Sequence, residues 1–323
     1  MMNHYSRKSL FGMSIAVSIM QFVLSPVSTA YADPPEAAVR VLTIGNSFAD
    51  NALTYLPQIA EAAGHNVIVG RANLGGCSFE RHWKHVAQHE ENPDSKEGSP
   101  YHGGRNSLKE LLTSDEWDFI TMQQYSYQSH DLKTYQPFAD NLVRYVKKHA
   151  PNARILVHQT WAYRVDDPRF RPSNQGKEPH THAVMYEQVR DAYHQFAESH
   201  DLEIIPSGDA LFLADTDQKW GYRADTNFDF GNATSPNLPL QTHSLHAGWS
   251  WTKDKDGSRV LKLDGHHASS VGQYLLGCVW FEKLFNESVI ENSFVPKGVD
   301  SGYAKFLRET AHAVTTGQLE SVQ

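Results

Sequence analysis

A serine near the start of the chain and an aspartate–histidine pair near its end have the residue types that nucleophilic catalysis requires. Ser47 closes a Gly-Asn-Ser segment at 45–47, directly after an apolar run, and Asp264 and His267 enclose an Asp-Gly-His-His segment at 264–267. A hydroxyl becomes a nucleophile when an imidazole removes its proton, and a carboxylate can hold that imidazole in the required tautomer. Together the two segments predict acyl transfer through a covalent intermediate on Ser47.

Each segment also has an ordinary structural interpretation. Ser47, with Asp50 three residues later, fits the N-cap of a helix. Asp264 and Gly265 fit a turn, and the histidines after them could be solvated surface residues in a chain that has 18 histidines. Only a fold that brings both segments together favours the catalytic interpretation.

Five short apolar runs, rich in β-branched residues, predict strands that are buried on both faces of a parallel sheet. The runs cover residues 39–44, 66–69, 118–122, 154–157 and 202–205. Amphipathic stretches predict helices at 53–63, 107–112, 137–149, 183–199, 269–285 and 303–315. This alternation predicts right-handed crossovers and an α/β fold with three layers. Because ligands bind outside the carboxyl ends of such strands, Ser47 is expected at the functional edge of the sheet.

Residues 1–32 predict a cleavable signal peptide. Two basic residues precede an apolar stretch from residue 10 to about residue 24, and an Ala-Tyr-Ala segment at 30–32 provides the small residues of a cleavage site. A membrane anchor is the alternative, but the apolar stretch is too short to span a bilayer. We therefore expect a secreted or periplasmic protein, with residues 33–323 as one domain and no stable membrane anchor.

The balance of charge argues against nucleic acid and anionic membranes as partners. The chain has 37 acidic and 29 basic residues, a formal net charge of −8, whereas phosphate binding depends on clustered Lys and Arg. This charge is compatible with a neutral sugar or a small ester as substrate. The two cysteines, Cys77 and Cys278, could form one disulfide bond in an exported protein but cannot frame a small disulfide-rich fold.

Two stretches interrupt the alternation of strands and helices. Residues 89–105 are polar and predict a surface excursion, whereas residues at about 214–261 form a long aromatic-rich insertion. Loops of that length in a compact domain are usually functional or disordered. The aromatic residues argue against disorder, so the insertion is expected to be ordered and to form part of a substrate lid.

Tryptophan and tyrosine side chains can stack on the apolar C–H faces of sugars. Trp220, Trp249 and Trp251 lie in the insertion, where they could line a glycan cleft or pack as a small separate core. Trp161 and Tyr163 follow the fourth strand and are expected at the functional edge of the sheet. We therefore expect Trp161, Tyr163 and Trp249 to contact substrate.

The order of four short segments along the chain resembles the SGNH (GDSL-like) hydrolase superfamily. The Gly-Asn-Ser segment follows the first strand, a glycine-rich turn follows the second, a polar turn follows the third, and Asp-x-x-His precedes a late helix. The resemblance covers about residues 39–285. It implies a three-layer α/β/α fold whose mostly parallel five-stranded sheet has a flavodoxin-like order.

The resemblance also implies a role for each matching residue. Ser47 would be the nucleophile, His267 its general base and Asp264 the partner of that base. The oxyanion hole of such enzymes uses the amide of the nucleophile, a glycine amide after the second strand and an asparagine side chain after the third. Ser47 and Gly76 would supply the two amides, because a glycine allows close approach of substrate. Gly75 would lie beside them in the substrate site.

The third segment departs from the family pattern. This chain has Gln-Gln-Tyr-Ser-Tyr at 123–127 where the family usually shows Gly-x-Asn-Asp. Without an asparagine there, Gln124 is expected to donate its amide to the oxyanion, and Ser126 is the alternative. Asn46 stands where aspartate is frequent in the first segment, and it is expected to border the substrate.

The pattern is closest to a poorly characterised, often secreted branch of the superfamily that is related to carbohydrate acetylesterases. It implies an exported serine esterase that removes short acyl groups from a carbohydrate and needs no cofactor. A catalytically weak glycan-binding protein on the same fold is one alternative, favoured by the missing asparagine. A metal-dependent hydrolase is another, built on the pairs His180 and His182, His243 and His246, or His266 and His267. None of these pairs has carboxylate or cysteine partners at a recognised ligand spacing, so no metal site is predicted.

Overall fold

A sheet of five parallel strands forms the centre of the molecule. The computed structural model describes residues 1–2, 38–171 and 179–318. The strands are β1 (Val39–Gly45), β2 (Val67–Asn73), β3 (Phe119–Met122), β4 (Arg154–His158) and β5 (Glu203–Ile205). They pair in the order β2-β1-β3-β4-β5, and every pair is parallel. The predicted fold class and strand order are confirmed.

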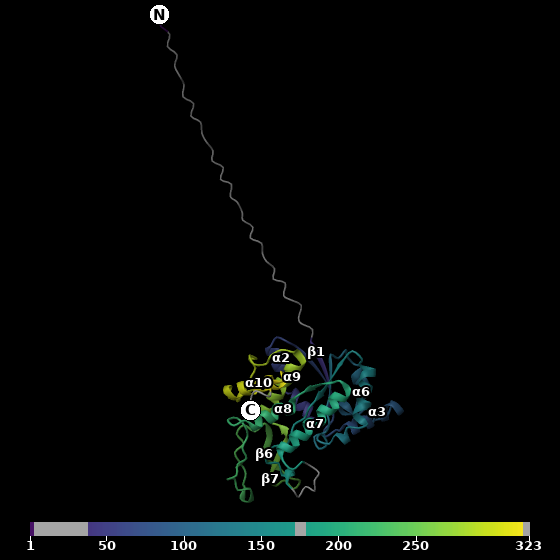
Figure 1. Cartoon of the computed structure of the whole chain (residues 1–323), viewed down its shortest axis with the longest axis vertical. Coiled ribbons are helices and arrows are strands. Elements are labelled where there is room, and N and C mark those ends of the chain that lie inside the picture. The colour runs from purple at the N-terminus through teal and green to yellow at the C-terminus, as the bar shows by residue number, and fades with distance from the viewer. Residues whose placement is uncertain (3–37, 172–178, 319–323) are drawn as a thin grey trace. The chain divides into compact units, whose positions relative to one another are not determined.

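Helices cover both faces of the sheet, which gives the three predicted layers (Figure 1). One face packs against α1 (Ser47–Leu53), α2 (Leu56–Ala62), α8 (Ser207–Thr216), α9 (Ser270–Phe285) and α10 (Ser301–Thr315). The other packs against α3 (Phe79–Glu91), α5 (Leu108–Leu112), α6 (Phe138–His149) and α7 (His182–His200). Val41 on β1 belongs to the first core, and its neighbour Leu42 belongs to the second. Alternate residues of one strand therefore serve two separate cores.

The helix predicted at 53–63 is in fact two helices, and it starts earlier. α1 begins at Ser47 because the Asn46 side chain accepts a hydrogen bond from the amide of Phe48. Pro57 lies in the first turn of α2, where its missing N–H costs nothing. The helices α3 and α8 have no counterpart among the predicted helices, and the short helix α4 (Tyr101–Gly104) lies within the predicted polar excursion.

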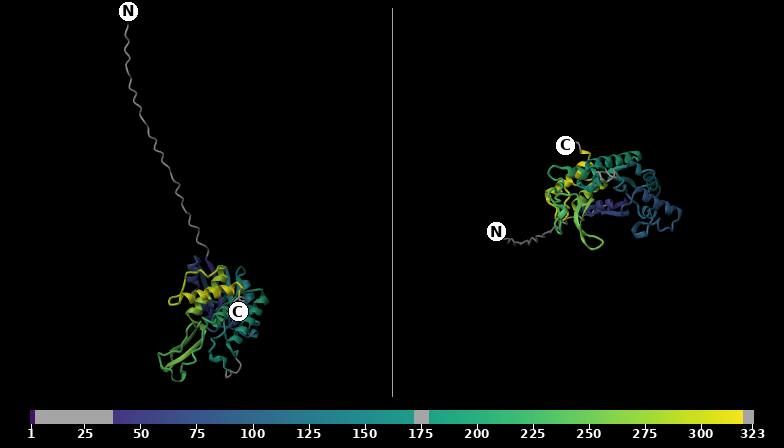
Figure 2. Two further views of the ribbon diagram at one scale, coloured as in Figure 1. Left: turned by 60° about the vertical axis from the view of Figure 1, so that its left-hand side comes forward. Right: turned by 90° about the horizontal axis from the view of Figure 1, so that it is seen from below.

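The insertion predicted at 214–261 contains regular structure. After α8 and the 3₁₀ helix η4 (Phe230–Asn232), the strands β6 (His246–Lys253) and β7 (Arg259–Ala268) form an antiparallel hairpin. Figure 2 shows this hairpin extending from the body of the protein. The last residues of β7 carry the Asp-Gly-His-His segment, so the hairpin delivers that segment to the sheet.

Two tryptophans of the insertion pack against protein instead of lining one cleft. The indole N–H of Trp251 donates to the carbonyl of Asn237 at 2.8 Å. Trp220 lies elsewhere, stacked on Tyr303 of α10 with ring centroids 5.2 Å apart. These contacts favour the interpretation that Trp220 and Trp251 pack within the protein, and not that they line a glycan cleft.

The predicted signal peptide at 1–32 lies outside the described residues, apart from its first two. All the elements above belong to one compact unit, Glu36–Gln323. Within the described part of the chain, no helix has the length and hydropathy to cross a membrane. Cys77 and Cys278 are buried free thiols, and burial raises the pKa of Cys77 to about 12.

Three fully buried histidines should make the protein sensitive to acid. Burial lowers the pKa of His82, His158 and His246 from 6.5 to about 3. Below pH 6.5 the unfolded chain therefore binds protons that the native protein does not bind. The free energy of unfolding consequently falls as the pH drops towards 3. Asp215 has the opposite effect on the free energy of unfolding, because burial raises the pKa of its carboxyl from 3.8 to about 7. The three histidines outweigh this single carboxyl.

We therefore expect the midpoint of urea-induced unfolding to lie at a lower urea concentration at pH 5.0 than at pH 7.5. Circular dichroism at the two pH values measures this difference. Equal midpoints would contradict the assignment of the buried histidines as neutral groups.

Candidate active site

The turn after β1 leaves the Ser47 hydroxyl available at the carboxyl edge of the sheet. Asn46, not Ser47, caps α1, since its side-chain oxygen accepts the amide hydrogen of Phe48 at 3.1 Å. The interpretation of Ser47 as an N-cap is therefore wrong. Its Oγ lies 2.9 Å from Nε2 of His267.

His267 and Asp264 come from the end of β7. Nδ1 of His267 lies 2.8 Å from Oδ2 of Asp264, and the amide of His267 donates to Oδ1 of the same carboxylate at 3.0 Å. Partial burial acts to raise the pKa of Asp264, but the hydrogen bonds from His267 and the neighbouring imidazoles hold it well below its ordinary value. The carboxylate is therefore ionised at neutral pH. It keeps a proton on Nδ1 of His267 and leaves Nε2 to face Ser47.

A second imidazole lies close to the other oxygen of Asp264. Nδ1 of His266 lies 3.0 Å from Oδ1 of Asp264. Burial, followed by repulsion from His267, lowers the pKa of His266 to about 4, so this ring is neutral at pH 7. Its ring centroid is 6.4 Å from that of Phe48 and 6.0 Å from that of Tyr163. Of the two adjacent histidines, His267 is therefore the one that can act on the serine.

Residues after β4 support the turn that carries the two histidines. The indole N–H of Trp161 donates to the carbonyl of His266 at 2.8 Å, and its ring stacks on Phe48 with centroids 4.2 Å apart. Trp161 and Tyr163 are only 1% and 0% exposed, so the prediction that they contact substrate is wrong. They hold the turn in place from within the protein.

The glycine-rich turn after β2 lies beside the nucleophile. The Asn46 side chain donates to the carbonyl of Cys77 at 3.0 Å. Gly75 and Gly76 are both exposed, and the carbonyl of Gly75 accepts a hydrogen bond from Arg81 at 3.1 Å. Gly76 has a φ of +57°, a conformation that favours glycine. The structure thus places Gly76 at the same edge as the serine.

The two side chains expected to replace the family's asparagine have other roles. Gln124 is fully buried, and its nitrogen donates to the carbonyl and the hydroxyl of Thr134, each at 3.2 Å. Its oxygen accepts from the amides of Phe79 and Tyr125, each at 2.9 Å. Ser126 is only 2% exposed. Contrary to the prediction, neither side chain offers a donor to substrate in this structure.

Asn46 and Trp249 are also not placed to contact substrate. Asn46 is 1% exposed and uses both ends of its side chain inside the protein. The register of the hairpin pairs Trp249 with Leu263, the residue before Asp264. Because neighbouring residues of a strand point to opposite faces, Trp249 points away from Asp264, and it packs on Phe230 with centroids 4.8 Å apart.

Tyr125, which was not among the predicted site residues, lies against the glycine-rich turn. A methyl group placed on Gly76 would be 3.5–3.7 Å from the ring edge and hydroxyl of Tyr125. Tyr125 is half-buried and packs on Tyr127, with ring centroids 5.1 Å apart, and Tyr127 is 42% exposed. The signal that could have found Tyr125 is its place beside Gln124 in the third segment.

A family model described as Domain of unknown function (DUF4886) matches residues 40–234 and 243–314. The chain belongs to the DUF4886 family. The first matched segment contains Ser47, and the second contains His267. A DUF4886 family protein from Bacteroides uniformis, known from a crystal structure, is 25% identical in sequence. Its structure matches with a TM-score of 0.66 over 86% of this chain and 95% of that chain. No curated protein matches the chain.

Two further solved structures match this DUF4886 chain at lower identity. A member of the lipolytic G-D-S-L family from Veillonella parvula is 14% identical, with a TM-score of 0.42 over 77% of this chain and 100% of that chain. The periplasmic domain of a lipopolysaccharide acetyltransferase from Salmonella Paratyphi A is 12% identical, with a TM-score of 0.43 over 79% of this chain and 85% of that chain.

Two of the histidines that were candidates for metal ligands form hydrogen bonds to protein groups in this DUF4886 chain. Nitrogens of His182 and His246 lie 2.7 and 3.0 Å from backbone carbonyls in the segment after β4. Among the described residues, Asp264, His266 and His267 form the one group whose ligand atoms lie within 4.8 Å of one another. These atoms are close because the His267 ring binds the Asp264 carboxylate at 2.8 Å and the His266 ring lies 3.0 Å from it.

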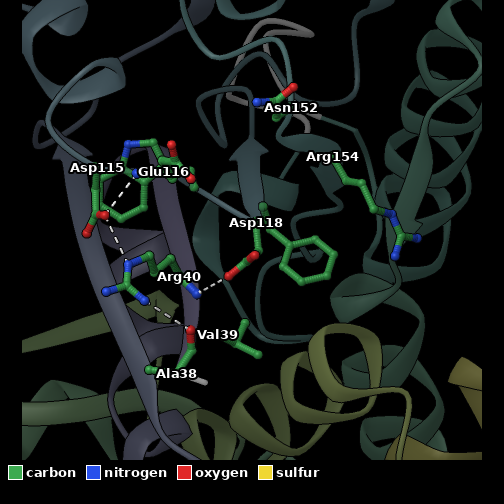
Figure 3. A pocket seen from close by; sticks show the side chains of 10 residues that line it. Ala38, Val39, Arg40, Asp115, Glu116, Asp118, Asn152 and Arg154 are labelled. Carbon is green, nitrogen blue, oxygen red and sulfur yellow. Dashed lines mark hydrogen bonds and ion pairs between the residues drawn. The ribbon is translucent and has the colours of Figure 1, made fainter. Parts of the chain in front are cut away.

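Figure 3 shows a hollow at the amino ends of β1, β3 and β4, the edge of the sheet opposite to Ser47. Arg40 binds two of the acidic residues that line it. Arg40 donates through Nε to Asp115 at 3.0 Å and through its backbone amide to Asp118 at 2.7 Å. We assign no function to this hollow, because none of the predicted site residues lines it.

Proposed function

We propose that this DUF4886 protein is a serine esterase that forms an acyl-enzyme on Ser47. One observation carries the proposal: Ser47 Oγ, His267 and Asp264 form a continuous hydrogen-bonded series, with distances of 2.9 and 2.8 Å. An imidazole held in this way can take the hydroxyl proton while the oxygen attacks an ester carbonyl.

In the first half of the reaction, Oγ of Ser47 attacks the carbonyl carbon and Nε2 of His267 takes its proton. The ionised Asp264 stabilises the imidazolium that forms. His267 then gives the proton to the oxygen of the leaving alcohol, the ester carbon–oxygen bond breaks, and the acyl group stays on Ser47. In the second half, His267 deprotonates a water that attacks the acyl group, and collapse releases the acid and restores the serine.

Three groups would bind the negative oxygen of the tetrahedral intermediate. The amides of Ser47 and Gly76 supply two of them. We assign the third to the hydroxyl of Tyr125, because this side chain comes from the third segment and lies against Gly76. Gln124 is the alternative in the same segment, but its nitrogen already donates hydrogen bonds to Thr134. A preorganised donor of this kind acts where charge develops in the transition state.

Replacing Tyr125 with phenylalanine is expected to lower kcat by about 100-fold, because one oxyanion donor contributes roughly that factor. KM should change little, since the packing of the ring is kept. Steady-state hydrolysis of p-nitrophenyl acetate measures both constants, with Tyr127→Phe as the control that should keep wild-type kcat. A Tyr125→Phe variant as active as wild type would remove Tyr125 from the oxyanion hole.

The proposed substrate is a carbohydrate that carries short acyl groups. Tyr127, exposed beside Tyr125, offers an aromatic face on which sugar C–H groups can stack. The net charge of −8 disfavours polyanionic substrates. A signal peptide at 1–32 would deliver the enzyme to the periplasm or the cell exterior, where such carbohydrates occur.

Hydrolysis of p-nitrophenyl acetate, butyrate and octanoate, and of acetylated oligosaccharides, tests this proposal with and without EDTA. We expect the acetate to be preferred, acetate to be released from the oligosaccharides, and EDTA to have no effect. Loss of activity in EDTA would favour a metal-dependent hydrolase on the Asp264, His266 and His267 group. Oligosaccharide binding without turnover would favour the glycan-binding alternative, which the missing asparagine supports.

A further inference from the structure

Three buried polar side chains connect the ends of neighbouring strands next to the nucleophile. Asn46 follows β1, Gln123 follows β3 and His158 ends β4, and each is at most 1% exposed. The Asn46 nitrogen donates to the carbonyl of Cys77, in the turn after β2, at 3.0 Å. The Gln123 nitrogen donates to the Asn46 oxygen at 2.8 Å, and Nδ1 of His158 lies 2.8 Å from the Gln123 oxygen. These bonds form a relay that follows the sheet order β2-β1-β3-β4.

Backbone groups at one end fix the direction of every bond in the relay. The Cys77 carbonyl can only accept, and the Phe48 amide, which binds the Asn46 oxygen at 3.1 Å, can only donate. Asn46 must therefore present its nitrogen to Cys77 and its oxygen to Gln123. Gln123 must in turn present its nitrogen to Asn46 and its oxygen to His158. It follows that His158 carries its proton on Nδ1.

The relay has a cost in the folded protein. Nε2 of His158 is buried and has no hydrogen-bond partner among the described residues, and the ring lies edge-on to Trp280 with centroids 4.8 Å apart. Gly45 gives Gln123 room to cross β1, because a methyl group on Gly45 would lie 3.0 Å from three atoms of the Gln123 side chain. Buried polar groups destabilise an apolar layer unless they are fully bonded. A relay that spans four strands for packing alone would be unfavourable.

We infer that Asn46, Gln123 and His158 are positioning residues that fix the distance between the two amides of the oxyanion hole. Asn46 is tied to both sides of the hole, because it precedes Ser47 and binds the residue after Gly76. Gln123 and His158 keep the Asn46 side chain in this orientation. Without them the two turns could shift, and a displacement of about 1 Å is enough to lower a rate roughly 100-fold. The inference rests on the proposed esterase function, but none of the three residues needs to touch substrate.

Two variants of His158 separate the hydrogen bond from the packing. His158→Asn keeps an N–H near the position of Nδ1, whereas His158→Leu has nearly the shape of asparagine and no donor. With p-nitrophenyl acetate we expect His158→Leu to lower kcat about 10-fold at unchanged KM, and His158→Asn to stay within about 2-fold of wild type. The inhibition constant of a boronic acid that mimics the tetrahedral intermediate should rise as kcat falls. The thermal unfolding midpoint should fall in both variants, because each leaves one buried polar oxygen without a donor.

Equal losses of kcat in the two variants of an active enzyme would overturn the inference, because His158 would then act by packing alone. Failure of the proposed function looks different, since the wild-type protein itself would not hydrolyse esters. The direction of the relay is tested without activity, by long-range ¹H–¹⁵N spectra of protein labelled with ¹⁵N-histidine. The His158 signals, identified by their absence from His158→Asn, should show the Nδ1–H tautomer from pH 5 to 8. An Nε2–H tautomer would overturn the inference.

Discussion

Replacing Ser47 with alanine is expected to lower kcat/KM for ester hydrolysis by roughly 10⁴-fold or more. The variant has no oxygen to attack the ester carbonyl, so His267 and Asp264 can act only on water. Any remaining turnover would come from substrate binding and from the oxyanion hole. The thermal unfolding midpoint should change little, because the Ser47 hydroxyl is partly exposed and binds His267 instead of a core group.

Ser199 offers a matched control for this variant. Its hydroxyl donates to the carbonyl of Phe196 near the end of α7, at 2.8 Å, so Ser199→Ala removes one hydroxyl outside the proposed site. Stopped assays on the two purified variants should show full activity for Ser199→Ala and almost none for Ser47→Ala. Full activity in Ser47→Ala would show that another group is the nucleophile.

The second largest effect is expected for Asp264→Asn. Asp264 accepts a hydrogen bond from the His267 ring at 2.8 Å, and its other oxygen lies 3.0 Å from Nδ1 of His266. An asparagine has one oxygen and one NH₂ group in place of two equivalent oxygens, and it lacks the charge that stabilises an imidazolium. We expect kcat to fall by roughly 10³- to 10⁴-fold, with a much smaller change in KM.

His266→Gln is the control for that prediction, because it leaves the contact between Asp264 and His267 intact. We expect His266→Gln to keep at least about a tenth of wild-type kcat, since His266 does not reach the serine. Steady-state kinetics on both variants, compared at the same pH, gives the two values. Equal losses would show that Asp264 acts mainly by holding the turn, and not through His267.

The sheet and its functional edge could be predicted because both follow from local patterns. Strands that are buried on both faces read as short apolar runs, such as the one at β1, and the carboxyl ends of parallel strands share one edge. That is enough to bring Ser47 and Gly76 together. His267 was placed at this edge by the family resemblance, since no local pattern shows where a distant turn returns to the sheet.

The partners of individual side chains could not be predicted, because they depend on contacts between distant segments. Gln124 has the chemistry of an oxyanion donor, yet Thr134 and Phe79 take up opposite ends of its amide. Trp161 follows β4 at the expected edge, but packing on Phe48 buries it. The residue types show what these side chains can do, and only the fold shows what they bind.

The hairpin is different, because the sequence contains a local pattern that predicts it. Asp256-Gly257 lies between two stretches with large apolar residues two positions apart, Trp249 and Trp251 before it and Leu261 and Leu263 after it. An Asp-Gly pair between alternating residues is a strong hairpin signal, and Gly257 has the positive φ, +86°, that such a turn needs. Trp249 and Trp251 in this stretch are compatible with a glycan cleft or a small separate core, and their spacing is also that of a strand.

Covalent labelling tests most directly whether Ser47 is the nucleophile. A fluorophosphonate phosphonylates a serine whose hydroxyl is activated by a neighbouring base, and mass spectrometry of the digested protein then locates the adduct. We expect one adduct per chain, on the peptide that contains Ser47, with esterase activity lost in proportion to labelling and no adduct in Ser47→Ala. An active esterase whose adduct lies on another residue, or that carries no adduct at all, would contradict the assignment of Ser47, His267 and Asp264 as the catalytic residues.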